Sequence, residues 1–81
     1  MTEQEIIDRA VPCFTALLGC KPEAVVAGAE LVGGLGMDSL DTIELAMAIE
    51  EEFEIEVSDA EVEALGTVGD VFALIRANLK G

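Results

Sequence analysis

Four helix-start signals divide the 81-residue chain and favour a helical fold throughout. Thr2 and Ser58 each stand three residues before a glutamate, the capping-box pattern in which side chain and backbone satisfy each other's hydrogen bonds. Asp38 and Thr67 each stand just before apolar residues at helical spacing. The sequence therefore predicts an all-α four-helix bundle, with one short helix and a long loop between the first and second helices.

The first predicted helix follows Thr2 and ends near Gly19, a residue type common just past helix C-termini. Because proline lacks the backbone N–H of an interior helical residue, Pro12 predicts a kink or a break. The apolar positions expected to face the core are Ile6, Ala10, Cys13 and Leu17, flanked by Ile7, Phe14 and Leu18.

Residues 20–37 contain four glycines and no sustained apolar period, so we expect a long loop. A loop of this length in a compact domain is usually functional or held by its own side chains. The side chains expected to hold it are Val25, Val26, Leu31 and Leu35.

The second predicted helix begins at Asp38 or Ser39 and ends near Phe53. Its core positions are expected to be Leu45, Ile49 and Phe53. A short third helix opens at Ser58 and is anchored by Val62 and Leu65. The fourth opens at Thr67, and its apolar positions are Val68, Val71, Phe72, Ile75 and Leu79.

The charge of the chain excludes several classes of partner. Its 17 acidic and 4 basic residues give a net charge of −13, which disfavours binding to nucleic acid and to anionic membrane. No apolar run approaches the length of a membrane span, and the N-terminal residues are acidic where a secretory signal is basic. We therefore expect a cytoplasmic monomer without membrane insertion, in which Cys13 and Cys20 are free thiols.

Ser39 stands where the glycine-containing loop turns into the acidic second helix. A serine at such a position is most often a plain N-cap, but Asp38 can take that role and leave Ser39 pointing outward. The chain contains no histidine and no G-x-S-x-G motif, so Ser39 has no base to activate it. The sequence therefore predicts a protein that is not an enzyme; if Ser39 reacts, another enzyme must supply the chemistry.

The residues around Ser39 carry a family resemblance. The first run is Leu35-Gly36-Met37-Asp38-Ser39-Leu40-Asp41-Thr42-Ile43-Glu44-Leu45, and Ala48-Ile49-Glu50-Glu51-Glu52-Phe53 continues it. The chain resembles the acyl carrier proteins of fatty acid synthesis over nearly its whole length, including the acidity, the long first loop and the short third helix. The resemblance implies a single acyl carrier domain over residues 1–81.

The same resemblance implies a function for Ser39. A phosphopantetheinyl transferase would attach 4′-phosphopantetheine there through a phosphodiester, and the terminal thiol would hold acyl groups as thioesters. A helix N-terminus suits this load, because its free N–H groups and positive dipole end favour a phosphate. In the similar carriers, acyl chains also enter between the helices.

The resemblance further implies that the second helix docks onto basic patches of acyl-transferring and fatty acid synthesis enzymes. The expected docking residues are Asp38, Leu40, Asp41, Ile43, Glu44, Met47, Glu50 and Glu51. We interpret Leu40, Ile43 and Met47 as an exposed apolar strip separate from the core positions. The alternative, that Ile43 is buried as well, stays open because core helices often have wide apolar faces.

Gly33-Gly34 departs from the resemblance, because fatty-acid carriers usually have acidic residues just before Leu35. This departure keeps open a carrier for polyketide, aminoacyl or specialised lipid synthesis. Ligand spacing predicts no metal site, and the one cation cluster left open consists of Glu50, Glu56 and Asp59. A third class, an acidic non-carrier binding protein such as a calcium sensor, has no D-x-[DN]-x-[DN]-G loop to support it.

Overall fold

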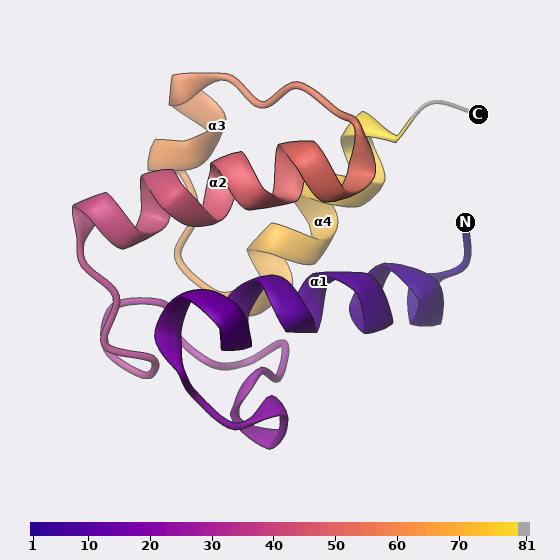
Figure 1. Cartoon of the computed structure of the whole chain (residues 1–81). Coiled ribbons are helices and arrows are strands. Elements are labelled where there is room, and N and C mark those ends of the chain that lie inside the picture. Colours follow the sequence, from indigo (N-terminus) through magenta and orange to yellow (C-terminus); the bar gives the residue numbers. More distant parts are fainter. Residues whose placement is uncertain (80–81) are drawn as a thin grey trace.

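The computed structural model describes residues 1–79 as a bundle of helices joined by loops (Figure 1). Its α-helices are α1 (Glu3–Leu18), α2 (Ser39–Phe53), α3 (Asp59–Glu63) and α4 (Val68–Asn78), and a short 3-10 turn, η1 (Pro22–Ala24), lies in the first loop. Within the described part, β-pairing is limited to one isolated bridge between Glu30 and Thr67. The predicted all-α fold, with its long loop and one short helix, is confirmed.

Every α-helix begins at the position that its sequence signal predicts. The N-caps are Thr2, Asp38, Ser58 and Thr67, and each forms a complete capping box with the acidic residue three positions later. These boxes satisfy N–H groups that a helix start otherwise leaves unpaired. At the other end, Gly19 caps α1 with a φ of 68°, as its residue type predicts.

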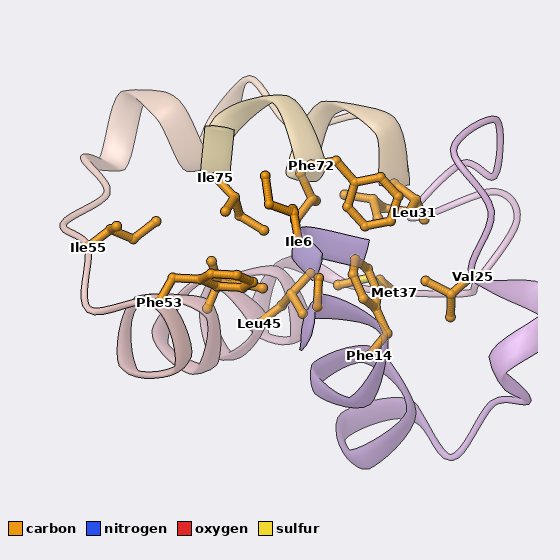
Figure 2. Close-up of a cluster of buried hydrophobic side chains, with 14 residues drawn as sticks. Ile6, Phe14, Val25, Leu31, Met37, Leu45, Phe53, Ile55, Phe72 and Ile75 are labelled. Atoms are coloured by element: carbon orange, nitrogen blue, oxygen red, sulfur yellow. The ribbon is translucent and has the colours of Figure 1, made fainter. Parts of the chain in front are cut away.

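The core lies between α1, α2 and α4 (Figure 2). The predicted positions Leu45, Ile49 and Phe53 of α2 are buried there, and no polar or charged residue among the described ones is buried. The nine largest side chains that are almost fully enclosed are Ile6, Phe14, Leu31, Met37, Leu45, Ile49, Val68, Val71 and Ile75. A core made only of apolar side chains is stabilised by burial and packing alone.

Helix α1 differs from its prediction in two ways. It continues without interruption past Pro12, so the expected break is absent. Pro12 is exposed, and so is Asp8, whose carbonyl loses its helical partner; water can satisfy that carbonyl. The buried positions of the helix are Ile6, Ala10 and Phe14, whereas Cys13 and Leu17 are only half-buried.

The long loop is held against the start of α4. Leu31 N–H donates to the Gly66 carbonyl at 3.0 Å, and Val68 N–H donates to the Ala29 carbonyl at 2.9 Å. Of the side chains expected to hold the loop, Val25 and Leu31 are buried and Leu35 is half-buried, but Val26 is 55% exposed. The loop also buries Met37, which the sequence analysis did not identify.

Helix α3 is the least embedded of the four. It has only five residues, none of them buried, and it ends at Glu63. Val62 and Leu65 are half-buried, and Leu65 packs against the core. Glu61 of its capping box also accepts a hydrogen bond from the Asn78 side chain at 3.0 Å. That bond, together with those from Ser58, lowers the pKa of Glu61.

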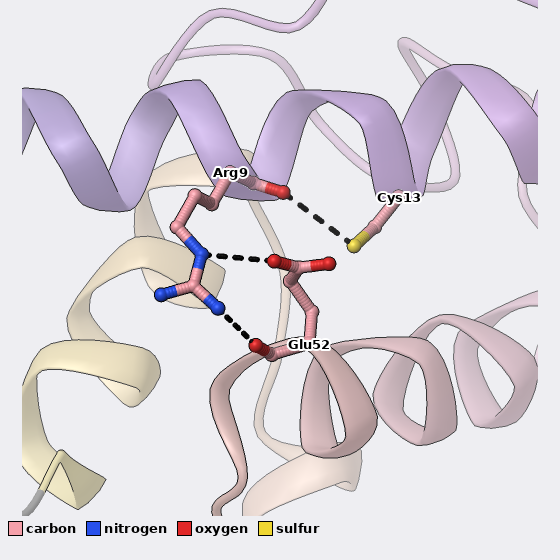
Figure 3. Close-up of polar contacts among 3 residues, drawn as sticks. All are labelled: Arg9, Cys13 and Glu52. Carbon is pink, nitrogen blue, oxygen red and sulfur yellow. Dashed lines mark hydrogen bonds and ion pairs between the residues drawn. The ribbon is translucent and has the colours of Figure 1, made fainter.

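Arg9 joins α1 to the C-terminal end of α2 (Figure 3). Its Nε donates to Glu52 Oε2 at 2.8 Å, its Nη2 donates to the Glu52 carbonyl, and its guanidinium lies 4.9 Å from the centre of the Phe53 ring. One carbonyl that the helix end would leave unpaired is thereby satisfied. Nearby, burial and the charge of Glu52 raise the pKa of the Cys13 thiol.

Candidate functional site

Ser39 is the first residue of α2 and lies on the surface. The capping role belongs to Asp38, since Asp41 N–H donates to Asp38 Oδ1 at 2.9 Å and Asp38 N–H donates to Asp41 Oδ2 at 3.2 Å. The prediction that Asp38 is the cap is confirmed. The Ser39 hydroxyl is consequently not needed to start the helix and is open to modification.

Met37 fixes the chain two residues before Ser39. Its side chain is 2% exposed, and its N–H donates to the Leu31 carbonyl at 3.0 Å. Gly36, which precedes it, has a φ of 71°, a conformation that glycine adopts without steric cost. Because Met37 is fixed in the core, Asp38 and Ser39 reach the surface at a defined position.

The start of α2 also suits an attached phosphate. The first turn of a helix has N–H groups without helical partners and the positive end of the dipole. Asp38 occupies only the N–H of Asp41 in this turn. With no histidine in the chain, Ser39 cannot be deprotonated by a neighbouring imidazole. The site fits a phosphodiester that an external enzyme forms on the Ser39 oxygen.

A cleft of about 350 Å³ opens beside Ser39, between α2 and α3. Its lining residues are Ser39, Thr42, Ile43, Val62, Glu63 and Leu65. A second cleft of about 340 Å³ shares Ile43, Val62 and Glu63 with it and extends along α2 to Glu50. Both clefts have a mixed lining of aliphatic and acidic side chains. Ile43, Val62 and Leu65 offer an apolar chain its contacts in the space next to Ser39.

The predicted apolar strip lies on the surface of α2. Leu40 is 63% exposed, Ile43 is 52% exposed and Met47 is 60% exposed. The alternative in which Ile43 is buried is wrong, because α3 is short and leaves that side of α2 partly uncovered. Exposed apolar residues grouped on one helix are typical of interaction sites.

The predicted acidic docking residues fall into two groups. Asp38, Glu44 and Glu51 are exposed, whereas Asp41 and Glu50 are half-buried. Glu50 has a structural contact that the sequence analysis missed, since its Oε2 accepts a hydrogen bond from Val57 N–H at 3.1 Å. This bond ties the segment before α3 to α2. Because it joins a residue of α2 to a loop residue seven positions later, no sequence pattern indicates it.

Two further searches cover the described residues. Among residues 1–79, no group of three or more His, Cys, Asp or Glu side chains is arranged to hold a metal ion, so the structure does not assemble Glu50, Glu56 and Asp59 into one. None of the described helices has the length and apolar character needed to cross a membrane.

Comparison with known proteins connects this geometry to a family. A protein-family model described as a phosphopantetheine attachment site matches residues 9–75. An acyl carrier protein of Rhodopseudomonas palustris (strain BisB18) is 46% identical over 76 residues, which cover 94% of this chain and 96% of that protein. One from Bradyrhizobium sp. (strain ORS 278) is 45% identical with the same coverage.

A solved structure gives the same assignment. It is described as an acyl carrier protein from Mycobacterium tuberculosis, and it superimposes with a TM-score of 0.83 at 28% identity. The match covers 89% of this chain and 96% of the other.

Proposed function

The chain belongs to the acyl carrier protein family, and we propose that it carries growing acyl chains for fatty acid synthesis on 4′-phosphopantetheine attached to Ser39. Proteins of this family are carriers and not enzymes, and 4′-phosphopantetheine is their prosthetic group. When bound, the group supplies the thiol that forms the thioester. In this proposal one acyl carrier domain spans residues 1–81.

The observation that carries the proposal is the exposure of Ser39 on the first turn of α2. The N-cap of this helix is Asp38, so the Ser39 hydroxyl has no capping role. Asp38 holds the helix start, so a phosphodiester on Ser39 removes no capping bond. The cleft that Ser39 lines supports an aliphatic cargo, because Ile43, Val62 and Leu65 lie in it next to the attachment position. No residue of the chain needs to perform the chemistry.

Identifying the acyl group that the protein carries in cells tests its proposed role in fatty acid synthesis. We expect protein purified from its own cells, under conditions that preserve thioesters, to carry saturated and 3-oxo or 3-hydroxy fatty acyl groups on its arm. Mass spectrometry of the peptide that contains Ser39 would identify them. Aminoacyl or polyketide intermediates in their place would contradict the role in fatty acid synthesis and leave the carrier assignment intact.

Partner enzymes are proposed to dock on α2 through the strip of Leu40, Ile43 and Met47 and through its acidic residues. Replacing Ile43 by glutamine should lower kcat/KM for an acyltransferase of fatty acid synthesis about five- to tenfold, because an apolar contact is lost from the interface. Thermal stability should hardly change, since the side chain is 52% exposed.

Val26 provides the matched control for this measurement. It is a similarly exposed aliphatic residue, at 55%, and it lies in the first loop instead of on α2. Val26→Gln should leave kcat/KM within about twofold of wild type. Equal losses in the two variants would show that general surface polarity, and not docking at α2, controls the rate.

A further inference from the structure

Asp70 holds the junction between α3 and α4. Gly66 N–H and Thr67 N–H both donate to its Oδ2, at 2.9 and 3.0 Å. These two bonds favour the charged carboxylate and thereby lower the pKa of Asp70. The bond from Thr67 belongs to the capping box of α4, whereas the bond from Gly66 reaches one residue beyond that box. Asp70 therefore fixes the backbone of Gly66 as well as the start of its own helix.

The junction in turn holds the loop that leads to Ser39. The Gly66 carbonyl accepts a hydrogen bond from Leu31 N–H at 3.0 Å, and the Leu31 carbonyl accepts one from Met37 N–H at 3.0 Å. The side chains of Leu31 and Met37 are buried. Met37 lies two residues before Ser39. This series of bonds connects Asp70 to the segment that places the Ser39 hydroxyl.

We propose that Asp70 is a positioning residue for the modification of Ser39 and acts on it through Gly66 and the loop. The inference rests on the proposed attachment of 4′-phosphopantetheine and adds a residue of another helix to it. Leu65, the neighbour of Gly66, lines the same cleft as Ser39, so the junction lies close to the attachment position.

The reaction that depends on this placement is a phosphoryl transfer. The Ser39 oxygen attacks the phosphorus of coenzyme A that bears the pantetheine, the pyrophosphate O–P bond breaks, and adenosine bisphosphate leaves. The hydroxyl proton passes to a base of the transferase. Because a small displacement of the attacking oxygen can slow such a step strongly, loosening the loop should lower kcat. Asp70 lies outside α2, the proposed docking helix, so KM for the carrier should hardly change.

Two alanine variants of the full chain separate positioning from stability. Asp70→Ala removes the acceptor of Gly66 N–H and should lower kcat for loading by a phosphopantetheinyl transferase about tenfold, with KM within about twofold of wild type. Thr67→Ala is the matched control. It removes the hydroxyl that accepts from Asp70 N–H, but it keeps both backbone N–H groups that donate to Asp70. Both variants should melt at a lower temperature, yet kcat of Thr67→Ala should stay within about twofold of wild type.

A third variant, Asp70→Asn, separates positioning from charge. Both bonds end on one oxygen of Asp70, so the single carbonyl oxygen of asparagine can accept them. We therefore expect kcat within about twofold of wild type. If the exposed carboxylate instead contacted a basic surface of the transferase, Asp70→Asn would be impaired as much as Asp70→Ala.

Amide hydrogen exchange, followed by NMR, measures the positioning without a transferase. In Asp70→Ala, exchange at Leu31 and Met37 should rise by a factor about ten times larger than at Ile49, a buried residue of α2 that reports opening of the core. In Thr67→Ala, the three amides should change by one common factor, because only the overall stability is reduced.

The outcomes that would overturn the proposal differ from those that concern the attachment site. Equal losses of kcat in Asp70→Ala and Thr67→Ala would assign the effect to the start of α4, and equal losses in Asp70→Ala and Asp70→Asn would assign it to charge. Exchange at Leu31 and Met37 that follows Ile49 in Asp70→Ala would show that Asp70 does not hold the loop. If wild-type protein accepted no group at all, the attachment to Ser39 would be refuted, and the exchange data alone would decide whether Asp70 fixes the loop.

Discussion

Replacing Ser39 by alanine should abolish loading of the prosthetic group completely. Wild-type protein incubated with coenzyme A and a phosphopantetheinyl transferase should gain the mass of one phosphopantetheine, and Ser39→Ala should gain none. The reason is chemical, because alanine offers no oxygen to form the phosphodiester. Mass spectrometry of the intact protein measures the gain. Since Asp38 caps α2, the variant should also melt at the wild-type temperature.

Ser58 is the matched control, because it is the only other serine in the chain. It caps α3, where its hydroxyl accepts a hydrogen bond from Glu61 N–H at 3.2 Å. Ser58→Ala should therefore accept the group normally but lose about 1 kcal/mol of unfolding free energy. Loading of Ser39→Ala by any of several transferases, or a normal mass gain that maps to Ser58, would refute the assignment.

Replacing Gly34 by alanine should destabilise the protein by about 1–3 kcal/mol, the range typical of steric overpacking. A Cβ built on Gly34 would lie 2.7 Å from the backbone carbonyl oxygen of Glu30 and 3.0 Å from the backbone nitrogen of Glu30. Backbone atoms cannot move aside as a side chain can. The same turn is closed by Gly34 N–H and Leu35 N–H, which both donate to that carbonyl at 2.9 Å. Urea denaturation measures the loss.

The neighbouring glycine separates this steric effect from general loop flexibility. A Cβ on Gly33 would meet only the carboxylate end of Glu30, at 3.2 Å, and that side chain can rotate away. Gly33→Ala should therefore change the unfolding free energy by no more than about 0.5 kcal/mol. If both variants were equally destabilised, the close approach at Gly34 would not be the cause.

This turn also changes how the departure at Gly33-Gly34 is understood. At Gly34 an acidic side chain is excluded by the backbone of Glu30, so glycine there follows from the local fold of the loop. Only Gly33 has room for a side chain. The departure therefore has a structural cause at one of its two positions, and glycine at that position does not by itself indicate a different cargo.

Local signals predicted the helices because each helix start satisfies its own hydrogen bonds. The boxes opened by Thr2 and Ser58 connect residues three positions apart, so the sequence contains all the information that they need. The i, i+4 repeat of Leu45, Ile49 and Phe53 likewise identified the buried face of α2. The exposure of Ser39 followed from Asp38 in the same local way.

Contacts between distant residues could not be predicted. Arg9 and Glu52 are 43 positions apart, and no spacing rule connects them. Pro12 was expected to disrupt α1, but the outcome depended on which side of the helix faces solvent once the bundle forms. Val25 and Val26 are adjacent and equally apolar, yet only Val25 is buried, because a loop without a repeat does not specify which residue turns inward.

The two ion pairs of residues 1–79 have a consequence for how the bundle opens. Both involve α1: Arg9 connects it to Glu52 of α2, and Arg76 of α4 connects to Glu3 at 2.6 Å. Helix α3 has no buried residue and forms no ion pair with any residue in 1–79. It is held by the half-buried Val62, by the hydrogen bond from Asn78 to Glu61, and by the flanking residues Val57 and Leu65. Local opening therefore costs least at α3. The α3 wall of the clefts between α2 and α3 can yield while the rest of the bundle keeps its shape.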